Sequence, residues 1–249
     1  MYEKELAFAN ELADLAADIS MRYFGGSFEV RLKEDMTPVT QADTEIEALI
    51  RDRLGERFSD DAVLGEEGGL HGEGDRVWVI DPIDGTKNFA AGIQVWGTLI
   101  SLMQDGRPVL GVASAPALGE RYEAIRGQGA RLNGQPIHVS DSAELSEAMV
   151  LFGTLSWASD HADQLRAVAA DAWRTRAFGD FWSHMLVARG SADAMIEESL
   201  RTWDTAAVQV IVEEAGGRMT AFDGGPLTDG GSALSTNGLL HEELVKRLA

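Results

Sequence analysis

The chain has 249 residues, 45% of them hydrophobic, so it can bury the core of one large domain or of two packed halves. Its 41 acidic and 21 basic residues leave a formal net charge of −20, which disfavours nucleic acid and anionic membranes as partners. Cysteine is absent, the N-terminal segment is acidic and amphipathic unlike a signal peptide, and no apolar run could span a membrane. We therefore expect a cytoplasmic protein without disulfides.

In the first half of the chain, two helical patterns are followed by a series of short strands. Apolar residues spaced by three and four predict a helix ending at Gly25-Gly26 and a second helix after "TPVTQAD" (37–43), with an alternating strand at 27–35 between them. Shorter apolar runs predict strands at 62–65, 76–81, 96–104 and 108–116, then antiparallel strands over 121–140 with a tight turn at Asn133-Gly134.

After about residue 140 strands and helices alternate. The pattern predicts strands at 148–153, 173–177, 193–197, 218–222 and 233–237, and helices at 159–171, 180–189, 203–217 and from about 238. We expect an α/β protein of stacked layers, with an N-terminal α+β half at 1–140 and a C-terminal α/β half at 141–249. No repeat or Pro/Ser-rich linker separates the halves, so they are expected to share an interface.

Three apolar runs lie directly beside carboxylates and small residues. Glu66 and Glu67 follow the first run, Asp81 and Asp84 in "VIDPIDGT" follow the second, and Asp204 precedes a long apolar helix. Several acids in one place are costly unless cations neutralise them. Oxygen ligands from aspartate and glutamate suit hard cations such as Mg²⁺. The pattern therefore predicts a magnesium site.

Each acidic site also has a simpler interpretation. Asp204 alone could be the N-cap of its helix, and the Glu66-Glu67 pair alone could be a turn. The 81–84 pair is harder to explain in this way, because Pro82 stiffens the turn and Gly85 lets the backbone approach a ligand. Gly85 would also open a helical turn whose N–H groups could bind an anion, which favours metal-assisted phosphoryl chemistry.

These motifs resemble the signature of the inositol monophosphatase superfamily of Mg²⁺-dependent, lithium-sensitive phosphatases. Residues 81–86 match the D-P-I-D-G-T motif without a gap, residues 65–67 match G-E-E, and residues 203–207 match W-D-x-A-[AG]. The three motifs occur in the same order, and the resemblance covers nearly the whole chain. It implies a five-layered αβαβα sandwich that forms a homodimer.

The resemblance also implies roles for individual residues. Glu66, Asp81 and the carbonyl of Ile83 would hold one Mg²⁺, while Asp81, Asp84 and Asp204 would hold a second, and Glu66 would share a third. Thr86 with Glu66 would orient and deprotonate a metal-activated water, so the implied catalytic residues are Glu66, Thr86 and Asp84. The implied substrate-binding residues are Gly85, Thr86, Asp180, Glu197 and Asp204. The implied outer-shell residues are Lys33, Asp43 and Glu67.

The segment from 174 to 204, which contains "GDFWSHMLVA", resembles the histidinol-phosphate phosphatase branch of the superfamily, especially its actinobacterial type. This resemblance implies hydrolysis of L-histidinol phosphate to L-histidinol and phosphate in histidine biosynthesis. Inositol enzymes carry threonine at the position of Asp180, which could therefore select a cationic substrate, although it could also only cap the helix at 180–189. Glu197 lies seven residues before Asp204, where family members contact the distal groups of the substrate.

Three alternatives remain open at this point. The same scaffold could act on inositol 1-phosphate or on a broad range of sugar phosphates. An aspartyl-nucleophile phosphatase would carry D-x-D-G-T, whereas the acids at 81 and 84 are one residue further apart. A non-catalytic acidic metal-binding protein would have no need of the threonine at position 86.

Overall fold

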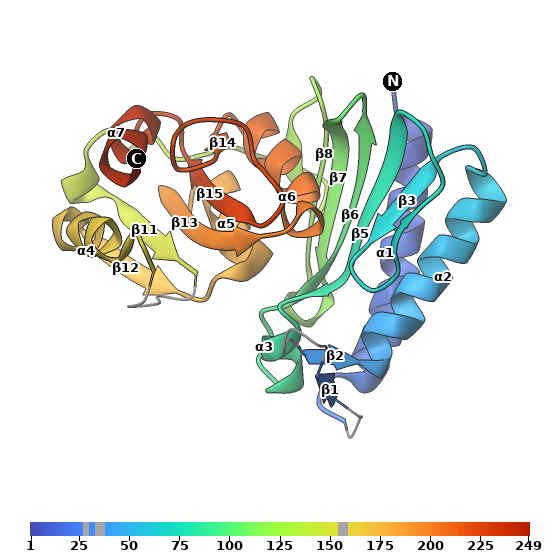
Figure 1. Cartoon of the computed structure of the whole chain (residues 1–249). Coiled ribbons are helices and arrows are strands. Elements are labelled where there is room, and N and C mark those ends of the chain that lie inside the picture. Colours follow the sequence, from blue (N-terminus) through green and yellow to red (C-terminus); the bar gives the residue numbers. More distant parts are fainter. Residues whose placement is uncertain (27–29, 33–37, 154–158) are drawn as a thin grey trace.

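Two sheets face each other across a pair of helices, and further helices cover their outer faces (Figure 1). The computed structural model describes residues 1–26, 30–32, 38–153 and 159–249. The helices are α1 (Glu3–Tyr23), α2 (Gln41–Arg57), α3 (Thr86–Ala90), α4 (Ala162–Asp171), α5 (Asp180–Ala188), α6 (Thr202–Glu214) and α7 (His241–Leu248), with the 3₁₀ turns η1 (Pro116–Leu118) and η2 (Leu145–Glu147). The layers confirm the αβαβα sandwich. None of the described helices is long and apolar enough to cross a membrane.

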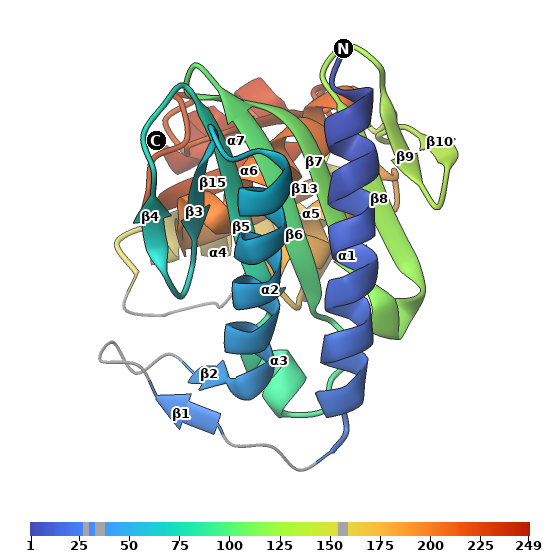
Figure 2. The ribbon, with the colours of Figure 1, turned by 90° about the vertical axis from the view of Figure 1, so that its right-hand side faces the viewer.

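The larger sheet has eight strands in the order β10-β9-β8-β7-β6-β5-β3-β4. The strands are β3 (Ala62–Gly65), β4 (Gly69–His71), β5 (Arg76–Asp84), β6 (Gly97–Gln104), β7 (Arg107–Ala115), β8 (Glu120–Ile125), β9 (Ala130–Leu132) and β10 (Gln135–Ile137). Helices α1 and α2 lie side by side across its outer face (Figure 2). Their apolar sides bury a core with the sheet that includes Leu12, Ile46, Ile50, Trp78, Ile80 and Ile100. Burial of these side chains removes apolar surface from water and so stabilises this half.

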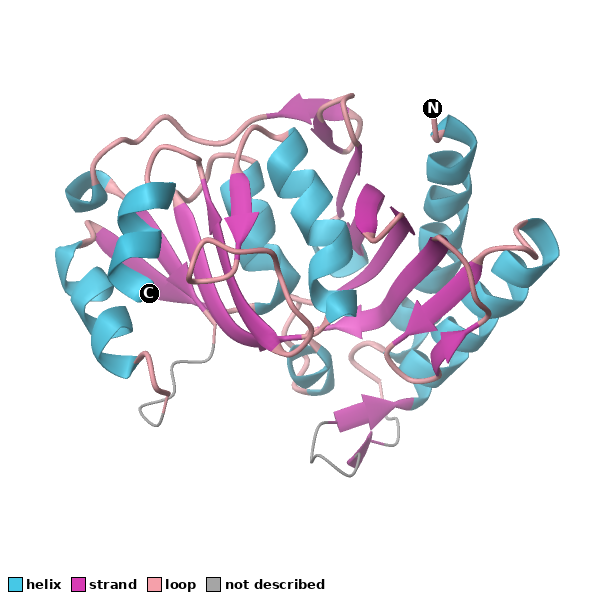
Figure 3. Ribbon diagram, turned by 45° about the horizontal axis from the view of Figure 1, so that its top comes forward, coloured by secondary structure: helices cyan, strands magenta, loops and turns pink. Residues whose placement is uncertain are grey.

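The smaller sheet has five strands in the order β12-β11-β13-β15-β14. The strands are β11 (Met149–Phe152), β12 (Arg174–Ala177), β13 (Ala194–Leu200), β14 (Arg218–Thr220) and β15 (Gly231–Thr236). Helices α5 and α6 lie between the two sheets, whereas α4 and α7 cover the far face (Figure 3). The central helices pack through Leu99, Tyr122, Phe181, Met185, Val208 and Ile211, so the two halves share an apolar interface.

Several predicted boundaries change in the structure. The strand predicted at 76–81 continues to Asp84, because β5 pairs with β6 as far as Asp84 opposite Gly97. The helix predicted from residue 159 begins only at Ala162. Of the strand predicted at 27–35, the described part is β1 (Val30–Leu32), which pairs with β2 (Pro38–Thr40). The turn at Asn133-Gly134 is confirmed, with φ values of 49° and 76° that match a two-residue hairpin turn.

Candidate active site

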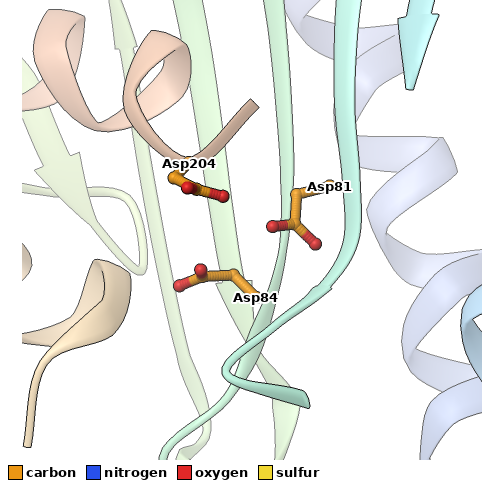
Figure 4. A group of neighbouring side chains, drawn as sticks. All are labelled: Asp81, Asp84 and Asp204. Carbon is orange, nitrogen blue, oxygen red and sulfur yellow. The ribbon is translucent and has the colours of Figure 1, made fainter. Parts of the chain in front are cut away.

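The end of β5 brings two aspartates to the interface between the halves. Asp81 and Asp84 are three residues apart, so a regular strand would direct them to opposite faces. The pairing of β5 with β6 is irregular between these two residues, which changes the direction of the second side chain. Both carboxylates meet that of Asp204 from α6 (Figure 4), and one oxygen from each lies within 4.8 Å of the others.

Asp204 reaches this group from the first turn of α6. The helix begins at Thr202, with Arg201 as its N-cap, so the interpretation of Asp204 as the N-cap is wrong. Asp204 is the third helical residue, and its Oδ2 accepts a hydrogen bond of 2.7 Å from the Arg201 N–H. This bond fixes the carboxylate at the start of the helix, where the helix dipole favours negative charge.

In the metal-free protein, the surroundings of the three aspartates disfavour their ionised form. Burial raises the pKa of Asp81 and of Asp84 well above the usual range, and repulsion by neighbouring acids raises both further. The pKa of Asp204 is raised to about 7, chiefly by burial. Oδ1 of Asp81 is buried and has no hydrogen-bond partner among the described residues. A buried, unpaired carboxylate oxygen beside two further carboxylates fits a divalent cation such as Mg²⁺.

Thr86 stands beside this group, just after a sharp turn. Gly85 has a φ of 81°, which other residues rarely adopt, and the turn starts α3 at Thr86. The Thr86 hydroxyl donates to the Ile83 carbonyl at 2.9 Å and lies 3.5 Å from Oδ1 of Asp43. The other oxygen of Asp43 accepts hydrogen bonds from the backbone N–H and hydroxyl of Thr40. Thr86 is therefore oriented from both β5 and α2.

The three aspartates and Thr86 open into one pocket of about 710 Å³. The pocket is lined by the predicted residues Glu66, Asp81, Ile83, Asp84, Gly85, Thr86, Asp180, Glu197 and Asp204. Asp43 and Glu67 are not part of this lining. Lys33 lies outside the described residues.

Asp180 connects the far wall of the pocket to the aspartate group. Its Oδ2 accepts a hydrogen bond of 3.1 Å from Asn88, and its N–H donates to Oε1 of Glu197 at 3.2 Å. The structure shows no side-chain capping bond at the start of α5, so the alternative capping role of Asp180 is not observed. Burial, followed by repulsion from Glu197 and Asp204, raises the pKa of Asp180 to about 7. The next residue, Phe181, donates its N–H to Asp84 at 2.6 Å.

The sequence patterns did not single out several residues of the far wall. Strand β13 is irregular between Glu197 and Leu200, so both Glu197 and its neighbour Glu198 line the pocket, although neighbours in a regular strand alternate between faces. Glu198 accepts hydrogen bonds from Ser159 and contacts His161. The remaining lining residues that were not predicted are Lys87, Asn88, Ser159, Phe178, Gly179, Ser199 and Leu200. In the sequence, Glu198 is marked only by its place beside Glu197, and two adjacent glutamates do not indicate an irregular strand.

His184 is another residue whose position could not be predicted. It is buried on α5. Its Nδ1 lies 2.7 Å from the Ser235 hydroxyl, and its Nε2 lies 3.4 Å from Oε2 of Glu197. The imidazole therefore lies beside a pocket carboxylate, but no hydrogen bond joins Nε2 to Oε2.

The metal-free protein is expected to lose stability as the pH rises from about 4 to about 7. Asp43, with a pKa of about 6, and Asp180 and Asp204, with values of about 7, keep protons in the folded state that the unfolded chain has already lost. Each such proton lowers the free energy of unfolding by about 1.4 kcal/mol per pH unit. Burial lowers the pKa of His241 from 6.5 to about 4, so this residue opposes part of the trend between these two pH values. Thermal unfolding in EDTA measures the slope.

Two comparisons make this measurement specific. Asp204→Asn should flatten the pH dependence, and Mg²⁺ should raise the melting temperature of the unmodified protein more at about pH 8 than at about pH 6. A metal-free protein that becomes more stable as the pH rises through this window would contradict the assignment.

Comparison with known proteins agrees with the motifs and the architecture. The sequence pattern of the inositol monophosphatase family matches residues 1–249. The histidinol-phosphatase of Mycobacterium tuberculosis is 45% identical over 257 residues, which cover 100% of this chain and 99% of that protein. The histidinol-phosphatase of Streptomyces coelicolor is 44% identical, with 98% of this chain and 96% of that protein covered.

Solved structures show the same fold. The Thermotoga maritima IMPase superimposes with a TM-score of 0.90 at 33% identity, and the alignment covers 98% of this chain and 96% of that one. The family pattern covers residues 1–249, and the structural alignment covers nearly the same span. The chain therefore belongs to the inositol monophosphatase family, and the protein is a phosphatase.

Proposed function

We propose that the protein is a Mg²⁺-dependent phosphomonoesterase that hydrolyses L-histidinol phosphate to L-histidinol and phosphate. The observation that carries the proposal is the composition of the pocket, which Asp180, Glu197, Glu198 and Phe178 line together with the aspartate group. The similarity to histidinol-phosphatases supports the same choice of substrate. The proposal includes a homodimer, which the family resemblance supports. It also includes a cytoplasmic location, which the absence of cysteine supports.

The phosphate end of the substrate belongs beside the metal ligands. Two or three Mg²⁺ ions would be held by Glu66, Asp81, Asp84, Asp204 and the Ile83 carbonyl. When bound, the ions would supply positive charge, which with three of them balances four carboxylates and a phosphate dianion, and would polarise the phosphoryl group and make water more acidic. A chain with a net charge of −20 has little other means of attracting a phosphomonoester.

The residues of the chain position water for attack on phosphorus. The Thr86 hydroxyl donates to the Ile83 carbonyl at 2.9 Å, so its lone pairs are available to accept a hydrogen bond from water. The Glu66 carboxylate lines the same pocket and would take the proton that the water loses. Water then attacks in line with the leaving alkoxide of histidinol, which takes a proton from solvent. Phosphate and histidinol are the products.

The far end of the substrate carries a protonated amine and an imidazole, which suit the other wall. Three carboxylates at positions 180, 197 and 198 would attract the cation, and the half-exposed Phe178 ring offers an aromatic face to it. Inositol phosphate carries only hydroxyls at this end and would gain less from the same charges.

A phosphate-release screen with Mg²⁺ tests this proposal. The substrates to compare are histidinol phosphate, inositol 1-phosphate, fructose 1,6-bisphosphate and adenosine 3′,5′-bisphosphate. The highest kcat/KM is expected for histidinol phosphate. A preference for inositol 1-phosphate would instead make the protein an inositol-type phosphatase on the same scaffold.

Asp180→Asn refines the test, because asparagine retains an oxygen that can accept the Asn88 hydrogen bond but removes the charge. The kcat/KM for histidinol phosphate should fall about 10- to 100-fold, while that for glycerol 2-phosphate, which has no cationic group, should change little. The assay is best performed at about pH 8.5, where a carboxyl with a raised pKa is ionised.

The matched control is Asp160→Asn, which removes the same charge from an exposed residue outside the pocket lining. Equal losses on both substrates in Asp180→Asn would show that this residue acts on the structure of the site and not on the choice of substrate.

A further inference from the structure

We propose that Glu47 is a positioning residue, which holds the turn at 65–69 so that Glu66 faces the aspartate group. The proposal rests on the metal-dependent part of the proposed function and not on the identity of the substrate. The turn connects β3 to β4, and β4 is the last strand of its sheet, with Leu70 63% exposed. A turn at such an edge has a neighbouring strand on one side only, so its position depends on contacts with the helix that packs on the face of the sheet.

Glu47 supplies that support from α2. It is only 3% exposed, and its two carboxylate oxygens accept the backbone N–H groups of Glu67 and Gly68, each at 2.7 Å. Hydrogen bonds from backbone N–H groups to an ionised carboxylate are among the stronger ones in proteins. Two of them on consecutive residues fix both the height and the orientation of the turn.

Arg51, one helical turn further along α2, completes the contact. Its Nε donates to Glu47 at 2.7 Å, and its Nη2 donates to the Gly69 carbonyl at 2.6 Å. A second guanidinium nitrogen, Nη1, donates to the Val63 carbonyl at 3.3 Å. The ion pair therefore binds both N–H and carbonyl groups of the β3–β4 hairpin, and the arginine compensates the buried charge of the glutamate.

The glycines of the turn fit this arrangement closely. A Cβ atom at Gly65 would lie 2.5 Å from Cδ of Glu47, and one at Gly68 would lie 2.8 Å from its Oε1. No side chain could be added at either position without moving the carboxylate or the turn. The glycines on both sides of the acidic pair thus let the backbone approach Glu47.

The support reaches the pocket through a single residue. The N–H of Glu66 donates to the Ile80 carbonyl at 3.2 Å, and the following N–H is the one bound by Glu47. The backbone of Glu66 is therefore fixed by β5 on one side, next to Asp81, and by α2 on the other. Glu47 itself does not line the pocket, and three donors already occupy its oxygens, so its role is to position and not to bind.

The test compares Glu47→Ala and Glu47→Gln with Glu56→Ala, an exposed glutamate on the same helix. Removal of a residue that orients a metal ligand typically weakens metal binding about 10- to 100-fold. We expect Glu47→Ala to raise the half-saturating Mg²⁺ concentration by this factor, with a smaller change in kcat at saturating Mg²⁺. For Glu47→Gln the half-saturating Mg²⁺ concentration should lie between those of the unmodified protein and Glu47→Ala. Glutamine keeps one accepting oxygen but replaces the other with an NH₂ donor.

Two further readouts do not depend on turnover. Mn²⁺ binding, measured by electron paramagnetic resonance without substrate, should weaken by the same factor as the half-saturation rises. Amide hydrogen exchange at residues 66–69 should become faster in the metal-free variants, while exchange within α2 and α1 stays unchanged. Since neither readout requires histidinol phosphate, both retain their meaning if the enzyme prefers another substrate.

Two results would overturn the proposal. One is unchanged Mn²⁺ affinity together with unchanged exchange at 66–69 in both Glu47 variants. The other is a general loss of protection across α2 and the sheet, which would make Glu47 a stabilising residue of the fold. Arg51→Met, which keeps the apolar stem, tests the same turn if Glu47→Ala does not fold, and it should give a weaker form of the same changes.

Discussion

Asp84→Asn is expected to lower kcat/KM for the preferred phosphomonoester by about 1,000-fold, which corresponds to about 4 kcal/mol of transition-state stabilisation. Asp84 is buried, and an oxygen of its carboxylate lies within 4.8 Å of ligand oxygens from Asp81 and Asp204. Asparagine has the same shape and can still accept the N–H of Phe181, but it removes one of the charges that a divalent cation requires. Phosphate release against Mg²⁺ concentration measures the loss.

Stability separates this effect from misfolding. Because the carboxylates repel one another, the metal-free Asp84→Asn protein should melt at a higher temperature than the metal-free unmodified protein. The control Asp160→Asn should retain full activity. Full activity of the unmodified protein after complete removal of metal by EDTA would exclude metal-assisted catalysis.

Thr86→Ala is expected to lower kcat by about 100- to 1,000-fold, the range typical of a lost proton-transfer or water-orienting group. The side-chain hydroxyl donates to the Ile83 carbonyl and lies near Asp43, and loss of one such hydrogen bond typically costs only about 1 kcal/mol of stability. The variant should therefore stay folded and keep the Mg²⁺ concentration needed for half-saturation. Thr86→Ser keeps the hydroxyl and should recover most of the rate.

The stereochemistry at phosphorus identifies the nucleophile in the same reaction. With a phosphorothioate substrate made chiral at phosphorus by isotopic oxygens, direct attack by water should give thiophosphate of inverted configuration. Retention of configuration would instead demonstrate two successive displacements through a covalent aspartyl intermediate.

Apolar spacing and the acidic motifs were enough to predict the architecture and the class of chemistry. Periodicity identified the strands before the acidic motifs and the layered α/β arrangement, since apolar spacing reflects which face of each element is buried. The three motifs identified the metal-ligand candidates, and the structure brings Asp81, Asp84 and Asp204 together. Apolar spacing and short motifs can be recognised in a sequence because each depends only on residues close together in the chain.

The directions of these side chains depend on how the strands and helices pack together. Asp81 with Asp84, and Glu197 with Glu198, share a pocket because β5 and β13 are irregular at those points, and pairing with the adjacent strand decides where an irregularity falls. The contact between Glu47 and the turn at 65–69 joins residues about 20 positions apart, and nothing in either segment specifies the other. Side-chain direction and long-range contacts come from packing of whole elements, so a local sequence pattern cannot encode them.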